Sequence, residues 1–157
     1  MLDNLTQLNQ EEKDLLIAAP TFVAALIGGA DGNFTDDEIE RAAEVIHIKT
    51  FSEKHEHVRE IYELLDHSQT EQDLVSLMVS LPKTAKERNL YLSTELEQLN
   101  GILPKLNYSF SIRYYKSLRQ IAHLVANADG GFWGMGAMHE AERVFVKLPM
   151  LIEPKKD

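Results

Sequence analysis

The residues best placed to do chemistry are carboxylates that lie within and after two copies of the tripeptide Ala-Asp-Gly. The first copy supplies Asp31, Asp36, Asp37 and Glu38, and the second copy supplies Asp129, Glu140 and Glu142. Hard divalent cations bind oxygen ligands of this kind, and the chain has no cysteine, the thiolate ligand that favours zinc. These residues therefore suggest the binding of a divalent cation, with Ca²⁺ or Mg²⁺ as the expected ion.

Both acidic sets belong to an internal repeat. Residues 23–34, VAALIGGADGNF, recur as residues 121–132, IAHLVANADGGF, and six of the twelve aligned positions are identical. Each copy is an apolar segment ending in Asp-Gly, which is typical of a helix followed by a turn. The repeat predicts two similar helix–turn–helix units, and therefore an all-α bundle with two pseudo-symmetric halves.

An aspartate at the C-terminal end of a helix needs a positive partner, because the helix dipole carries partial negative charge there. Two partners are open for Asp31 and Asp129. The N–H groups of the following helix can donate hydrogen bonds to the carboxylate, which then acts as an extended cap, or a metal ion can bind it. An EF-hand is excluded, since Asp36 stands where that loop requires glycine and Ala42 stands where it requires glutamate.

The second unit carries an insertion. Thr35-x-x-Glu38 aligns with His139-x-x-Glu142, which leaves six additional residues, 133–138. The loop 131–138 contains the only tryptophan of the chain, together with glycines and methionines. Aromatic and methionine side chains are enriched in protein interfaces. The residues predicted to bind a protein partner are Phe132, Trp133 and Met135.

Capping signals and hydrophobic periodicity predict about seven helices. Residues 9–12 and 35–38 form capping boxes that start two of them, and Pro20 is expected to divide or kink the first. The other expected starts are Ser52, Thr70, Pro82, Tyr108 or Ser109, and His139, and Pro149 is expected to end the last helix. No segment alternates with the period of a strand. We expect one domain over residues 1–157, with its core at about residues 10–149 and a polar tail at 153–157.

Composition narrows the class of protein. The 157 residues are 44% hydrophobic and 26% charged, as in an ordinary globular protein. The net charge of −9 argues against general binding to nucleic acid or to anionic membranes. Residues 15–30 are uncharged but short for a membrane span, and the absence of cysteine fits a reducing compartment. We therefore expect a soluble, cytoplasmic protein that does not insert directly into a membrane.

The segments LIGGADGNFTDDEIE and VANADGGFWGMGAMHEAE resemble the tellurite-resistance TerB-like family, over roughly residues 15–149. The resemblance implies an all-α bundle of pseudo-twofold halves, a divalent cation at the acidic turns, and links to stress response and to membrane-associated complexes. Its implied cation ligands are Asp31, Glu38, Asp129 and Glu142. His139 departs from the small hydroxyl cap expected at that position.

These patterns predict a TerB-like, non-catalytic binding module of the stress response that binds a divalent cation. No nucleophile motif accompanies the carboxylates. The alternative is a metal-free helical adaptor that binds a protein partner through the loop 131–138. A hydrolase that uses the acidic residues is a third class.

Overall fold

The computed structural model describes residues 5–30, 32, 34–65, 67–129 and 140–156, and of residues 67–70, 128–129 and 140–142 it describes the backbone alone. The helices are α1 (Gln10–Gly28), α2 (Asp36–Ser52), α3 (Glu56–Glu63), α4 (His67–Ser80), α5 (Ala85–Glu97), α6 (Leu99–Ile102), the 3₁₀ turn η2 (Leu103–Lys105), α7 (Tyr108–Asp129) and α8 (Glu140–Phe145). None of these residues forms a strand. The predicted all-α bundle is confirmed.

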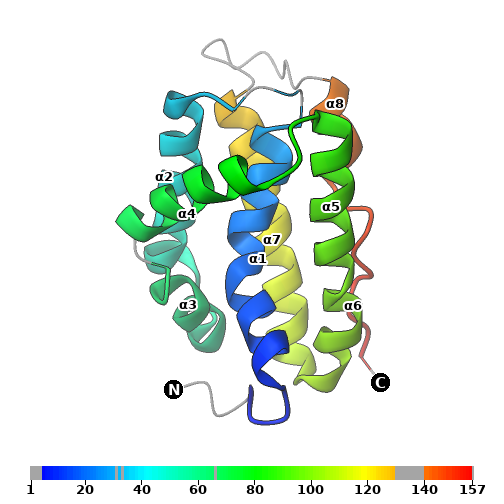
Figure 1. Ribbon diagram of the computed structural model, residues 1–157. Coiled ribbons are helices and arrows are strands. Elements are labelled where there is room, and N and C mark those ends of the chain that lie inside the picture. The colour runs from blue at the N-terminus through cyan, green and yellow to red at the C-terminus, as the bar shows by residue number, and fades with distance from the viewer. Residues whose placement is uncertain (1–4, 31, 33, 66, 130–139, 157) are drawn as a thin grey trace.

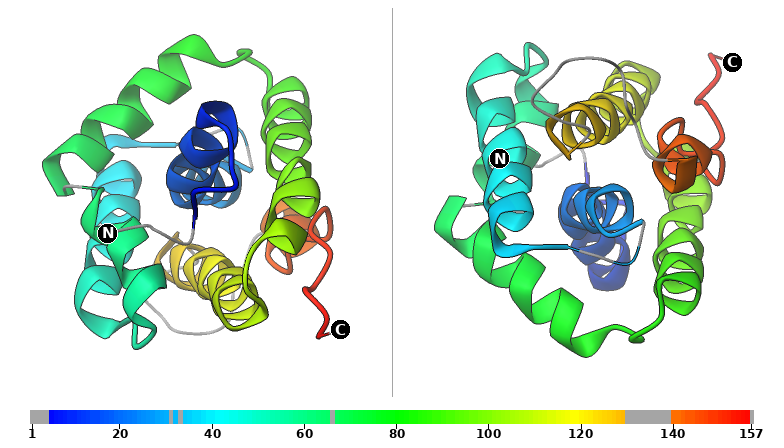
Figure 2. Two further views of the ribbon diagram at one scale, coloured as in Figure 1. Left: turned by 90° about the horizontal axis from the view of Figure 1, so that it is seen from below. Right: turned by 90° about the horizontal axis from the view of Figure 1, so that it is seen from above.

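Helix α1 is the centre of the bundle (Figures 1 and 2). It contacts each of the helices α2 to α8, and Leu16, Val23 and Leu26 on it are fully buried. The uncharged stretch 15–30 is therefore the central part of the hydrophobic core of the bundle. Among the residues that the structure describes, no helix is both long and apolar enough to cross a membrane.

Pro20 lies inside α1, yet the helix continues unbroken to Gly28. Proline has no N–H to donate to the carbonyl four residues earlier, which belongs to Leu16. Tyr114 of α7 replaces that donor, because its buried hydroxyl donates to the Leu16 carbonyl oxygen at 2.6 Å. This bond satisfies the carbonyl that proline leaves open, and the division of the helix that Pro20 suggested does not occur.

Local capping signals are confirmed at several helix starts. Asn9 and Glu12 form both bonds of a capping box at the start of α1. The hydroxyl of Thr35 accepts from the Glu38 N–H at 3.2 Å at the start of α2. The start of α7 at Tyr108 also agrees with the prediction. Each of these signals lies within a few residues of the helix it starts.

Two predicted starts are wrong. Ser52 is the last residue of α2, and α3 is capped instead by His55, whose Nδ1 accepts from the Val58 N–H at 3.4 Å. The chain leaves α2 only at Glu53, which is extended and buries its side chain. Pro82 does not start α5 either.

Helix α5 begins at Ala85, after Thr84, whose hydroxyl accepts from the Glu87 N–H. A threonine can bond to the open N–H groups at a helix start, whereas a proline side chain cannot. Helix α4 also starts earlier than predicted, at His67 in place of Thr70.

The chain after α8 turns back along the bundle. Helix α8 ends at Phe145, three residues before the predicted end. The chain then turns at Leu148, which adopts a left-handed φ of 51° and donates its N–H to the Phe145 carbonyl oxygen at 2.7 Å. Asn100 of α6 then holds the chain. Its amide donates to the Met150 carbonyl oxygen and accepts from the Ile152 N–H, both at 2.8 Å. The C-terminal segment therefore lies along α5 and α6 (Figure 1).

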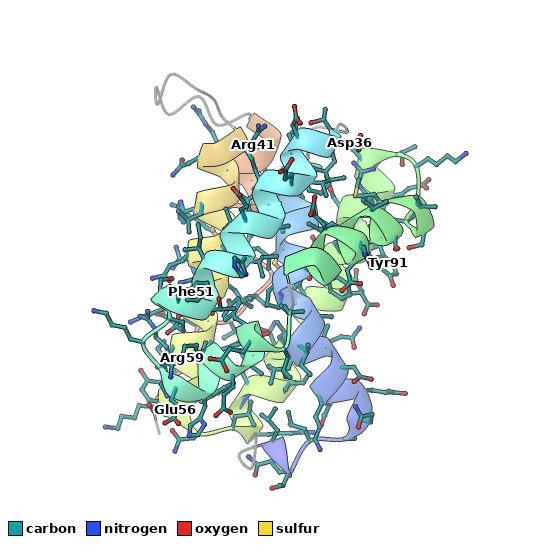
Figure 3. The ribbon with its side chains drawn as sticks, turned by 90° about the vertical axis from the view of Figure 1, so that its left-hand side faces the viewer. Asp36, Arg41, Phe51, Glu56, Arg59 and Tyr91 are labelled. Carbon is teal, nitrogen blue, oxygen red and sulfur yellow. The ribbon has the colours of Figure 1, made fainter. Side chains whose placement is uncertain are left out.

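The two repeat helices, α1 and α7, lie side by side and run in the same direction (Figures 1 and 2). Both end at one end of the bundle, where α2 and α8 begin. We name this region the Asp-Gly end. Figure 3 shows Asp36 there, and Arg59 and Glu56 toward the opposite end.

Candidate functional site

The turn that ends α1 needs glycine at two positions. Gly32 has a left-handed φ of 99°, which favours glycine, and its N–H donates to the Gly29 carbonyl oxygen at 3.0 Å. A Cβ on Gly28 would lie 2.5 Å from the ring of Phe34, so glycine lets that ring pack directly against the helix. The second copy has Ala126 at the position of Gly28. A ring could not approach the backbone there in the same way.

The C-terminal end of α1 receives its positive charge from α5. The last turn of α1 contains no basic residue. Arg88 is only 4% exposed and donates from Nη2 to the Gly29 carbonyl oxygen at 2.7 Å. The neighbouring Asn89 donates to the Ala30 carbonyl oxygen at 3.3 Å. A guanidinium at this place bonds an open carbonyl and opposes the negative end of the helix dipole.

Arg88 is a third source of positive charge at the C-terminal end of α1. The sequence suggested two others, the N–H groups of the following helix and a metal ion. The signal for this arginine was present in the sequence, because Arg88 stands four and eight residues before the core leucines Leu92 and Leu96. Residues at this spacing share one face of a helix. An arginine on the same helix face as core leucines is rarely buried unless its charge is paired. Here the C-terminal end of α1 provides the negative partner, through the Gly29 carbonyl oxygen.

The predicted cation ligands are distributed around the Asp-Gly end. Asp36, Asp37 and Glu38 form the first turn of α2, Asp129 is the last residue of α7, and Glu140 and Glu142 lie in α8. Figure 2 shows the starts of α2 and α8 on opposite sides of the α1–α7 pair. The first turn of α2 and the start of α8 are therefore two separate groups at one end of the bundle.

Several predicted site residues cannot be placed. Asp31, Phe132, Trp133 and Met135 lie outside the described residues, as does the rest of the loop 131–138. For Asp129, Glu140 and Glu142 only the backbone is described. Among the described residues, no group of three or more histidine, aspartate and glutamate side chains is arranged to hold a metal ion. Cation binding and partner binding by these residues stay predictions.

A second charged cluster joins α2 to α7. The Glu53 carboxylate is buried, with one oxygen 2.5 Å from Arg113 Nε and the other 3.6 Å from Lys49 Nζ. Lys49 also donates to Gln120 of α7. Burial acts to raise the pKa of Glu53, but the hydrogen bonds from Arg113 and from the His55 N–H, with the charges of Arg113 and Lys49, hold that pKa below its usual value.

The same burial lowers the pKa of Lys49, against the opposing effect of Glu53. The negative charge of Glu53 is thus paired with the positive charges of Lys49 and Arg113 at the interface between α2 and α7. The cluster is a cross-link between α2 and α7, because its charged groups are already engaged within the chain. It is therefore a structural feature of the bundle.

Comparisons of the chain with protein-family models, with curated proteins and with solved structures give no match. The resemblance to the TerB-like family therefore stays a hypothesis, carried by the two Asp-Gly segments.

Proposed function

We propose that this chain is a non-catalytic binding module that binds a divalent cation at its Asp-Gly end. The observation that carries the proposal is the parallel packing of α1 and α7, which brings the ends of both repeat helices to one end of the bundle. The acidic first turn of α2 and the start of α8 lie at that same end. Carboxylate ligands without thiolates suit Ca²⁺ or Mg²⁺.

The TerB-like resemblance supplies the setting of this proposal: a cytoplasmic module of the stress response, linked to membranes only through a partner complex. The duplicated Asp-Gly unit within an all-α bundle supports it. Binding in place of catalysis is supported by the exposure of Asp36 and Asp37, since catalysis by carboxylates usually needs a site that excludes water.

The test is a calorimetric titration with Ca²⁺, Mg²⁺ and Mn²⁺. The wild type should bind at least one ion, and the variant that combines Asp31→Asn with Asp129→Asn should lose this binding. The matched control combines Glu44→Gln with Glu97→Gln, two exposed acids away from the repeat turns, and should bind as the wild type does. An ion at 100 times its Kd should stabilise the fold by about 2.7 kcal/mol. Absence of heat and of any melting shift with all three ions would exclude the cation.

A metal-free helical adaptor is the second candidate, and Arg88 is the observation that favours it. The buried guanidinium already supplies positive charge at the α1 corner, so that corner does not depend on an ion. In this case the loop 131–138 binds a protein partner. A partner that binds the wild type in the presence of a chelator and is lost in Trp133→Ala, with unchanged melting, would favour the adaptor over the cation module.

A further inference from the structure

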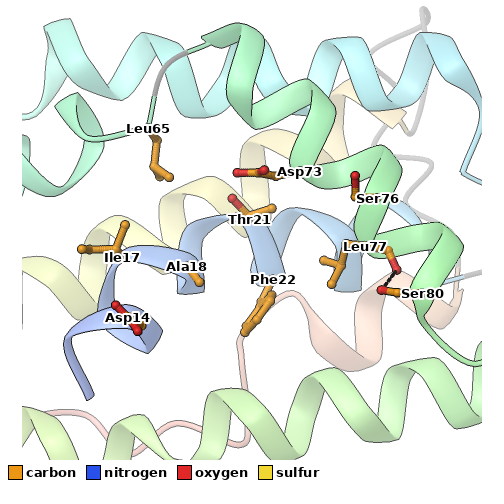
Figure 4. A pocket seen from close by; sticks show the side chains of 10 residues that line it. All are labelled: Asp14, Ile17, Ala18, Thr21, Phe22, Leu65, Asp73, Ser76, Leu77 and Ser80. Atoms are coloured by element: carbon orange, nitrogen blue, oxygen red, sulfur yellow. Dashed lines mark hydrogen bonds between the residues drawn. The ribbon is translucent and has the colours of Figure 1, made fainter. Parts of the chain in front are cut away.

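A groove with a volume of about 490 Å³ lies between α1 and α4. Helix α1 contributes one stripe of side chains, from Asp14 to Phe22, and α4 contributes a facing stripe, from Asp73 to Ser80 (Figure 4). The residues of each stripe are three or four positions apart, so each stripe is a single helix face. The volume lies within the range of pockets that bind small molecules.

Thr21 places an unpartnered hydroxyl in this groove. Its side chain is only 5% exposed, and Oγ1 has no hydrogen-bond partner among the described residues. A threonine inside a helix commonly bonds the carbonyl four residues earlier, and Thr21 does not. Figure 4 shows the hydroxyl on the side of Thr21 that faces Asp73. A buried hydroxyl without a partner is unfavourable, and a bound donor would remove this penalty.

The charged side chains that line the groove are both acidic, among the residues whose side chains the structure describes. They are Asp14 of α1 and Asp73 of α4, and none of the ten described lining residues is basic. Its floor is apolar, with the partly buried side chains of Ile17, Phe22 and Leu77 packed against the core. The groove therefore combines two carboxylates and a hydroxyl acceptor with an apolar surface.

We propose that the α1–α4 groove binds a small organic cation, an ammonium group on an apolar body. The ammonium donates to the Asp73 carboxylate and to Thr21 Oγ1, and the body lies against Ile17, Phe22 and Leu77. Asp14 adds negative potential at the other edge. This binding is independent of the proposed cation site at the Asp-Gly end, because no residue is shared between the two.

Other small ligands fit this chemistry less well. An organic anion would face two carboxylates, with no basic side chain among the described lining residues to pair with. A bare divalent ion prefers six or more oxygen ligands, and half of the ten described lining residues are apolar side chains that provide none. An ammonium group uses both parts of the groove, since it pairs with the carboxylate while its body covers the apolar floor.

Three probes of the same shape test the proposal by calorimetry with the full chain: phenylbutylammonium, phenylbutanol and phenylbutyrate. The ammonium should bind, the alcohol should bind about tenfold more weakly, and the carboxylate should not bind. Affinity for the ammonium should fall as salt is raised, since the pair with Asp73 is partly exposed. Equal affinity for all three probes, or binding of a basic amphipathic peptide without binding of the ammonium, would overturn the proposal.

Variants locate the site. Asp73→Asn should weaken ammonium binding about threefold to tenfold, and Ala18→Leu, which fills the groove floor, should abolish it at an unchanged melting temperature. Glu44→Gln on α2 is the control of equal charge change and should bind as the wild type does.

Thr21→Val keeps the shape of the side chain without its hydroxyl. It should weaken ammonium binding about threefold while raising the melting temperature of the ligand-free chain. This opposite effect on binding and stability separates a ligand contact from a purely structural role, and it stays measurable if Ala18→Leu disturbs the fold. Unchanged ammonium affinity in both Asp73→Asn and Thr21→Val would contradict the proposed site.

Discussion

The two sides of α1 differ in how the polar groups of α1 itself are satisfied. On the side of α5 and α7, neighbouring helices reach across to α1: Tyr114 donates to the Leu16 carbonyl oxygen and Arg88 donates to the Gly29 carbonyl oxygen. On the side of α4, the Thr21 hydroxyl has no hydrogen-bond partner among the residues that the structure describes, and carboxylates line an open groove. We name these the closed side and the open side of α1.

This difference separates the polar groups of α1 that stabilise the fold from the one that we assign to ligand binding. On the closed side, a proline that removes one hydrogen bond is matched by a tyrosine that restores it, and a helix end is matched by an arginine. The open side keeps a buried hydroxyl that the fold leaves unmet. A buried polar group without a partner calls for an explanation, because substitution alone could remove it, and the proposed ligand of the groove supplies one for Thr21.

The largest expected effect comes from the cluster beside the closed side. Glu53→Gln leaves the buried ammonium of Lys49 without its negative partner, so it should destabilise the fold by about 3–5 kcal/mol. Urea unfolding measures the change. A loss below about 1 kcal/mol would show that the cluster does not cross-link α2 and α7.

The same variant predicts a pH dependence. The folded-state pKa of Glu53 is lower than its ordinary value of 4.5. Its contribution to stability is therefore complete above that ordinary value and is lost as the pH falls through the folded-state pKa. The difference in unfolding free energy between the wild type and Glu53→Gln should be greatest at neutral pH and should shrink in acid. A difference that grows in acid would contradict this assignment.

The next effect comes from the end of α1. Arg88→Met should destabilise the fold by about 2–3 kcal/mol, because it removes a buried charge-assisted hydrogen bond to Gly29. It should also tighten divalent-cation binding at the Asp-Gly end, since a fixed positive charge is gone. Calorimetry and urea unfolding measure the two effects. Arg88→Lys keeps the charge, so tighter ion binding in that control would show that charge is not the cause.

A double-mutant cycle sharpens the pairing of Pro20 with Tyr114. Tyr114→Phe should cost about 1–2 kcal/mol in the wild type, because the Leu16 carbonyl is left without a donor. In the Pro20→Ala background the restored N–H can bond that carbonyl, so the same substitution should cost clearly less. Chemical unfolding of the four proteins gives the coupling energy. Equal losses in both backgrounds would mean that the tyrosine does not compensate for proline.

The smallest effect is expected on the open side and has the opposite sign. Thr21→Val should stabilise the ligand-free fold by about 0.5–1 kcal/mol, because it removes a buried hydroxyl without a partner. Thr21→Ser keeps the hydroxyl and should not stabilise. If Thr21→Val is destabilising in thermal and urea unfolding, the hydroxyl has a partner in solution and the contrast between the two sides of α1 is lost.

The features that could be predicted from the sequence are those that local signals control. The capping box at Asn9, the cap at Thr35 and the start of α7 follow from residues within one helical turn, and each was predicted. The bonds that finish the closed side join residues far apart in the chain: Arg88 and Gly29 are separated by 59 residues, and Tyr114 and Leu16 by 98. No local pattern specifies such pairs.

For the candidate site, the repeat led to the acidic residues and to the expectation of two matching units. Their separation into two groups could not be read from spacing, because it depends on where α2 and α8 lie around α1 and α7. The open groove was hidden for a similar reason. The residues from Asp14 to Phe22 look like part of an ordinary core helix, and only the placement of α4 shows which face stays open.

Paramagnetic broadening by Mn²⁺ tests the proposed binding module most directly. Substoichiometric Mn²⁺ should broaden the amide signals of Gly32 and Glu38 first, at the Asp-Gly end. The signals of Arg59 and of the first turn of α7, toward the opposite end, should stay sharp. The variant with Asp31→Asn and Asp129→Asn should lose this pattern. Broadening spread evenly over exposed acids, or unchanged in that variant, would contradict a cation site at the Asp-Gly end.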